Sequence, residues 1–138
     1  MQNSGNKLLH AELTEKVIGC FYEVYNDLGH GFLESVYENA LSVALGQAGF
    51  KVGRQVPLAV WYRGIQVGEF RADVLVNDTV LLELKTARSI DFAFEKQILN
   101  YLRATKVEVG LILNFGPSAQ FRRFVFENPQ KGNPRSSA

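Results

Sequence analysis

The first third of the chain repeats apolar residues every three and four positions, which is the spacing of one face of an α-helix. The pattern predicts a helix over about residues 8–28, ended by Gly29, and a second helix over about 33–48, ended by Gly49. The predicted apolar faces are Leu13, Val17, Cys20, Phe21, Val24 and Leu28 in the first helix, and Leu33, Val36, Tyr37, Ala40, Leu41, Ala44, Leu45 and Ala48 in the second.

After residue 50 the pattern changes to that of β-strands. Runs rich in β-branched and aromatic residues, separated by turn residues, predict strands over 51–62, 65–76 and 79–85 that pair as an antiparallel meander. A third helix is predicted over 91–105, with Ser89 or Asp91 as its N-cap. Two further strands are predicted over 107–115, which is almost continuously apolar, and over 121–126.

The order α-α-β-β-β-α-β-β predicts an α/β fold in which a mixed sheet carries helices on its faces. The crossover through the third helix predicts that the fourth strand lies parallel to the third. With 138 residues the chain is expected to form one domain, residues 1–138, with a core over about 8–127 and a polar tail over 128–138.

Composition excludes several classes of protein. The single cysteine, Cys20, rules out an internal disulfide and a cysteine-based zinc cluster, and its apolar helical position predicts a buried thiol. Residues 1–7 lack the apolar stretch of a signal peptide, and no run approaches the roughly 18 apolar residues of a membrane span. A cytoplasmic protein with no membrane partner is expected.

The net charge of +1 is unevenly distributed. Residues 1–50 hold two bases and six acids, a balance of −4, whereas residues 51–138 hold thirteen bases and eight acids, a balance of +5. The basic part would attract a polyanion such as nucleic acid. A solvated surface of mixed charge explains the same numbers.

Three ionisable residues lie at the ends of two neighbouring predicted strands: Asp73, Glu83 and Lys85. A three-residue turn at 77–79 would place Asp73 opposite Glu83 on one face of the sheet, with the carboxylates about 5 Å apart, whereas a two-residue turn would not. Because like charges repel, such a pair favours a divalent cation, and oxygen ligands suit Mg²⁺ or Mn²⁺. Lys85 would point at the same space. The alternative is a solvated strand end in which Glu83 and Lys85 form a loose ion pair.

Several ordered segments resemble one known family. Gly31-Phe-Leu-Glu34-Ser-Val-Tyr37 is similar to the G-x-x-E-x-x-Y signature of the GxxExxY proteins, a branch of the PD-(D/E)xK nuclease superfamily with a restriction-endonuclease-like core. The resemblance extends over about residues 9–126 through four further segments: 70–73, 82–85, 97–102 and 110–116. One departure is Ala72, which stands where the superfamily name has proline.

The resemblance implies a three-layer α/β/α core and a role for each matching residue. Asp73 and Glu83 would bind metal, Lys85 would be the catalytic lysine, and Glu34 would be a further acidic residue on or near the metal. Gln97 and Tyr101 look like the Q-x-x-x-Y element of RecB-like nucleases, close to the metal, the lysine or a substrate phosphate. Without the resemblance, Tyr37 and Tyr101 are equally well explained as core residues, and Glu34 as a favourable charge at a helix N-terminus.

The function implied is metal-dependent hydrolysis of phosphodiester bonds in DNA, or in RNA. Arg71 and Arg88 are the arginines closest in sequence to the candidate site and are the best candidates for phosphate contacts, but surface charge is the favoured explanation for each. Two alternatives remain: a non-catalytic nucleic-acid-binding module, and an accessory subunit whose partner supplies specificity. A homodimer is also open.

Overall fold

The computed structural model describes residues 10–127 of the chain. The predicted polar tail, the N-terminal residues 1–7 and the predicted start of the first helix lie outside this range. In chain order the elements are α2 (Ala11–Leu28), α3 (Glu34–Gln47), β1 (Val52–Tyr62), β2 (Ile65–Val76), β3 (Val80–Lys85), α4 (Phe92–Ala104), β4 (Val109–Phe115) and β5 (Ala119–Val125).

The order of elements predicted from the sequence is confirmed, and only their ends differ. The first helix begins at Ala11, three residues later than predicted. Strand β4 begins two residues later than predicted, and β5 begins at Ala119 instead of Phe121. Asp91 is the N-cap of α4, and its side chain accepts a hydrogen bond of 2.8 Å from the Ala93 N–H.

The five strands form one mixed sheet in the order β1-β2-β3-β4-β5. Strands β1, β2 and β3 are antiparallel neighbours, as the meander pattern predicts. Strand β4 lies parallel to β3 after the crossover through α4, and β5 returns antiparallel to β4. The prediction of a parallel third and fourth strand is therefore correct.

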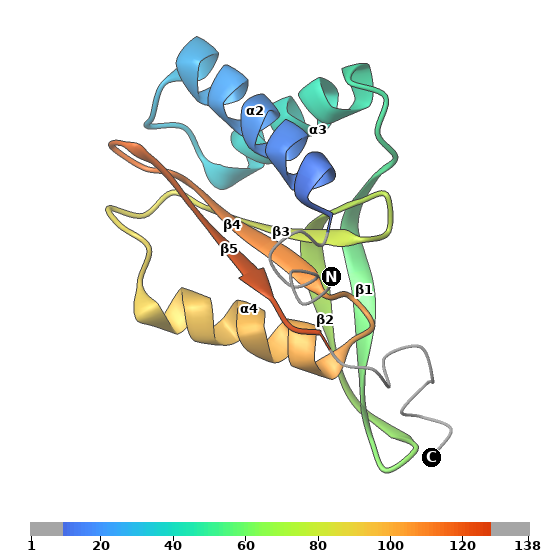
Figure 1. Cartoon of the computed structure of the whole chain (residues 1–138). Coiled ribbons are helices and arrows are strands. Elements are labelled where there is room, and N and C mark those ends of the chain that lie inside the picture. The colour runs from blue at the N-terminus through green and yellow to red at the C-terminus, as the bar shows by residue number, and fades with distance from the viewer. Residues whose placement is uncertain (1–9, 128–138) are drawn as a thin grey trace.

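The sheet is the middle of three layers. Helices α2 and α3 cover one face, and α4 covers the other (Figure 1). Strand β3 is buried on both sides because its side chains alternate: Val80, Leu82 and Leu84 pack with α2 and α3, while Leu81 packs with Ile98 and Leu102 of α4. The three-layer α/β/α fold is confirmed. No helix within residues 10–127 is both long and apolar enough to cross a membrane.

The sheet opens where β2 and β3 part. Their pairing covers only Val74 with Leu82, Leu75 with Leu81 and Val76 with Val80, so the first part of β2 has no partner in β3. That part stays paired with β1 and forms a long hairpin extending away from the rest of the sheet (Figure 1). The opening lies at Asp73 and Glu83, which are the next residues along each strand.

Candidate metal centre

Asp73 and Glu83 stand at the point where the two strands separate. The last residues of β2 and the first of β3 enclose a three-residue turn, since Val76 pairs with Val80. This is the turn length that directs the two carboxylates to the same place. The ladder does not continue past Val74 and Leu82, because the Asp73 Oδ2 accepts a hydrogen bond of 2.8 Å from the Leu84 N–H.

The Glu83 carboxyl group is held in an unusual environment. The residue is only 8% exposed, and its Oε2 is buried with no hydrogen-bond partner among residues 10–127. Burial, followed by the charge of Asp73, raises the pKa of Glu83 to about 8. A buried carboxylate with an unpaired oxygen is unfavourable unless a proton or a cation neutralises it.

Lys85 lies on the same face of β3 as Glu83, towards α4. Its Nζ is 4.5 Å from the centroid of the Phe94 ring, an arrangement that holds an ammonium group by cation–π attraction. Burial raises the pKa of Asp73, and both a hydrogen bond from the Leu84 N–H and the charge of Lys85 oppose that rise. Lys85 thus lies within electrostatic range of both carboxylates.

Glu34 reaches the same region from the other face of the sheet, at the first turn of α3. Burial raises its pKa, the charge of Lys85 opposes the rise, and the charge of Asp73 adds to it. The loop before α3 is closed by Tyr37, which is fully buried: its hydroxyl donates a hydrogen bond of 2.6 Å to the Gly29 carbonyl oxygen. Gly31 in this loop has φ +113°, which few other residues adopt. Both ends of the Gly31-x-x-Glu34-x-x-Tyr37 motif therefore shape the segment that presents Glu34.

Helix α4 brings Tyr101 to the carboxylates and leaves Gln97 at the surface. The Tyr101 ring stacks on Phe70 of β2 with centroids 3.6 Å apart and planes 7° apart. Burial raises the pKa of Tyr101, and the charges of Glu83 and Asp73 add to the rise. Gln97 is exposed one helical turn earlier.

The two arginines singled out from the sequence are both exposed. Arg71 uses its Nη1 to donate a hydrogen bond of 3.0 Å to the Gln55 carbonyl oxygen in β1. Arg88 lies in the loop between β3 and α4. Arg71 is thus engaged in a contact within the protein, two residues before Asp73.

A family model described as the PD-(D/E)XK nuclease superfamily matches residues 11–124, which is most of the chain. The chain belongs to the PD-(D/E)XK nuclease superfamily. The crystal structure of SSO0001 has the same fold, with a TM-score of 0.51 and 20% sequence identity. The matched region covers 93% of this chain but only 64% of SSO0001, so this chain spans less than two thirds of that protein. No curated relative matches the sequence.

Members of this superfamily generally use divalent metals, and the residues at the opening of the sheet fit such an ion. Within residues 10–127, no three His, Cys, Asp or Glu side chains converge into a preformed cage. Mg²⁺ does not require one, because it commonly binds through one or two carboxylates and keeps several waters. The unpaired Oε2 of Glu83, together with Asp73, supplies hard oxygen donors of the right kind.

A further polar residue, which the sequence analysis gave no role, supports the loop after Lys85. Asn114 of β4 is fully buried and lies opposite Lys85 in the parallel register. Its Oδ1 accepts a hydrogen bond from the Ala87 N–H, and its Nδ2 donates one to the Ala87 carbonyl oxygen, both at 2.9 Å. A Cβ at Gly116 would come within 2.1 Å of that carbonyl oxygen. Its sequence signals were a polar residue inside an otherwise apolar strand and its place in the family-like segment 110–116.

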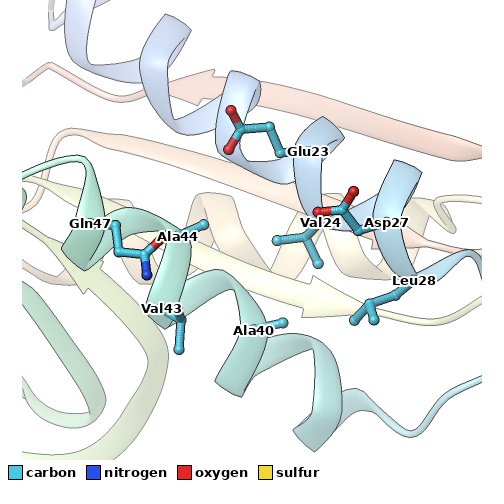
Figure 2. A pocket seen from close by; sticks show the side chains of 8 residues that line it. All are labelled: Glu23, Val24, Asp27, Leu28, Ala40, Val43, Ala44 and Gln47. Carbon is cyan, nitrogen blue, oxygen red and sulfur yellow. The ribbon is translucent and has the colours of Figure 1, made fainter.

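A separate groove lies between α2 and α3, with a volume of about 320 Å³ (Figure 2). It contains none of the predicted site residues; its lining is Glu23, Val24, Asp27, Leu28, Ala40, Val43, Ala44 and Gln47. Both charged side chains in it are carboxylates, which would repel a polyanion. The candidate site residues therefore gather at the opening between β2 and β3 and not in this groove.

Proposed function

We propose that this chain is a metal-dependent nuclease of the GxxExxY branch. It hydrolyses phosphodiester bonds, with DNA as the first candidate substrate and RNA as the second. The single observation that carries the proposal is the Glu83 carboxyl group, which is buried, has an unpaired oxygen and lies beside Asp73 and Lys85. A superfamily whose members generally use divalent metals gives this arrangement a ready explanation.

In this proposal Asp73 and Glu83 hold the metal, and Glu34 adds a third negative charge next to it. A bound Mg²⁺ or Mn²⁺ would supply Lewis acidity and lower the pKa of a water molecule. The Leu84 N–H already orients Asp73 through its Oδ2, so the other carboxylate oxygen remains to face the metal. Glu83 must lose its proton to act as a ligand.

Lys85 acts on the reacting groups. Its ammonium can donate hydrogen bonds to the attacking water and to a non-bridging phosphate oxygen, and its charge stabilises the negative charge that grows there. The Phe94 ring keeps the ammonium group close to the carboxylates without consuming a hydrogen-bond donor.

The remaining predicted residues would bind and orient the substrate. The Tyr101 hydroxyl would contact the scissile phosphate or the water beside it, with Gln97 on the exposed side of the same helix. Arg88, at the entrance to α4, and Arg71 would attract the flanking phosphates. Both belong to the part of the chain with a balance of +5.

A cleavage assay tests the proposal. Labelled single-stranded, duplex and branched DNA, together with RNA, would be incubated with the protein and Mg²⁺ or Mn²⁺, beside an EDTA sample and the Lys85→Ala variant. Cleavage that disappears in both controls supports the proposal and identifies the substrate class. Folded protein that cuts nothing in the panel contradicts it and favours a binding module or a subunit that requires its partner.

A further inference from the structure

Gln55 has a backbone conformation that its place in the sheet does not require. Its φ is +49°, in the left-handed region that residues other than glycine rarely adopt. It lies inside β1, and its neighbours Arg54 and Val56 pair normally with Val74 and Ala72. Gln55 itself drops out of the pairing at the position opposite Asp73. No chain reversal occurs there that would explain the conformation.

The conformation is held by contacts on both sides. The Gln55 carbonyl oxygen accepts the hydrogen bond of 3.0 Å from the Arg71 guanidinium. The Gln55 Nε2 donates a hydrogen bond of 2.9 Å to the Oε1 of Glu38 on α3. Glu38 is fixed in turn by Arg54, whose Nε lies 3.2 Å from its Oε2. The strained residue is therefore tied to β2 by its main chain and to α3 by its side chain.

Gln55 lies opposite Asp73, between the paired positions Arg54–Val74 and Val56–Ala72. Burial raises the pKa of Asp73, the charge of Glu38 adds to the rise, and the Gln55 side chain opposes it. A primary amide has two N–H donors, which is enough for one carboxylate on each side. A strained backbone conformation persists only where surrounding contacts offset its cost, and such conformations cluster at functional sites. Here the strained residue places its amide against Glu38, at the position opposite Asp73.

We propose that Gln55 is a positioning residue that fixes the orientation of the Asp73 carboxylate and connects it to Glu38 on α3. The inference rests on the proposed function, in which Asp73 is a metal ligand. Gln55 touches neither the metal nor the scissile bond. It acts as the outer partner of a ligating carboxylate, a role whose loss typically weakens metal binding about 10–100-fold.

The test is Gln55→Gly, with the melting temperature as a check on stability and two readouts of the site. Glycine adopts positive φ without strain. If Gln55 has a purely structural role, the variant should therefore be at least as stable as the wild type and bind Mn²⁺ equally well. The positioning role predicts an unchanged or higher melting temperature together with Mn²⁺ binding weakened about tenfold or more, measured by calorimetry. In metal-free protein, the Leu84 amide, which donates to Asp73, should exchange its hydrogen about tenfold faster, while the Leu82 amide is unchanged.

Two further variants serve as controls. Arg63→Gly changes another exposed residue of positive φ, 51°, at the far end of the hairpin, and should alter neither readout. Gln55→Glu keeps the size of the side chain but has no N–H donor, so it should accelerate Leu84 exchange at least as much as glycine does.

The outcomes separate this inference from the proposed function. Unchanged Leu84 exchange in Gln55→Gly overturns the positioning role, whatever the metal does. An equal rise at Leu82 also overturns it, because general loosening then explains the change. Wild-type protein that binds no Mn²⁺ defeats the proposed function, yet faster exchange at Leu84 alone would still support the positioning of Asp73 by Gln55.

Discussion

The Asp73 carboxylate accepts a hydrogen bond of 2.8 Å from the backbone N–H of Leu84, the residue between Glu83 and Lys85. In a continued antiparallel ladder, a backbone carbonyl oxygen of β2 would accept the hydrogen bond from Leu84 in β3. Here the Asp73 side chain of β2 accepts it instead. This one contact ends the pairing of β2 with β3 and places Asp73 beside Glu83 and Lys85.

The first prediction concerns the stability of the metal-free protein. The pKa of Glu83 rises from an ordinary value of 4.5 to about 8, so between these values the folded protein keeps a proton that the unfolded chain releases. The free energy of unfolding in EDTA should therefore fall as pH rises from 4.5 to 8, by up to roughly 1.4 kcal/mol per pH unit. Urea unfolding at several pH values measures the slope.

The matched variant is Glu83→Gln, which keeps the shape of the side chain but cannot ionise. It should be more stable than the wild type at pH 8 in EDTA, with a shallower slope. Some slope should remain, because the pKa values of Asp73 and Glu34 are also raised and act in the same direction. Equal slopes in both proteins would show that Glu83 is not the titrating group.

The second prediction separates catalysis from metal binding at Lys85. Lys85→Ala should lower the cleavage rate about 10²–10³-fold, because a donor aimed at the developing charge is lost. Mn²⁺ affinity should not fall, since a positive charge beside the carboxylates has been removed. Lys51→Ala, which breaks an exposed pair with Asp78, is the control and should cut at the wild-type rate. A Lys85→Ala protein as active as the control would exclude the catalytic role.

The third prediction concerns the loop that follows Lys85. Asn114→Leu should destabilise the protein by about 2–4 kcal/mol, because it removes two hydrogen bonds and leaves the Ala87 N–H and carbonyl without partners. Denaturant unfolding measures the loss. Asn100→Leu, at an exposed position of α4, should stay within about 0.5 kcal/mol of the wild type. Similar values for the two variants would contradict the role of Asn114.

The fourth prediction concerns Tyr37. Tyr37→Phe keeps the ring that stacks on Phe115 at 4.3 Å but removes the hydroxyl that donates to Gly29. The expected loss is about 1–2 kcal/mol, with faster hydrogen exchange at the Phe32 amide, which donates to the same hydroxyl. Tyr22→Phe, at a partly exposed ring, is the control. An unchanged exchange rate at the Phe32 amide would show that Tyr37 contributes only through the packing of its ring.

Much of the fold could be predicted from the sequence because it depends on local patterns. The alternation in β3 gives two buried faces, and the residues at 77–79 allow the three-residue turn that is found. That turn length sets Asp73 opposite Glu83, but the separation of β2 from β3 at these residues was not predicted. Strand ends were less predictable: Ala119 and Gln120 extend β5 only because Asn114 and Phe115 of β4 offer them partners.

The supporting contacts of the site could not be predicted, because each joins segments far apart in the chain. The left-handed conformation of Gln55 has no local signal, since it depends on Arg71 and Glu38, 16 and 17 residues away. Asn114 binds the backbone of Ala87, 27 residues earlier, and any residue except proline at position 87 would offer the same two groups. Sequence patterns identify candidate ligands more readily than the contacts that orient them.

The most direct test of the central claim is calorimetric titration of the wild-type protein with Mn²⁺ at pH 7, repeated in buffers of different ionisation enthalpy. Because the pKa of Glu83 is about 8, metal binding should release close to one proton per ion. Glu83→Gln should bind weakly and release no such proton. The absence of binding by folded wild-type protein, or equal binding and proton release in both proteins, would contradict a metal centre at Asp73 and Glu83.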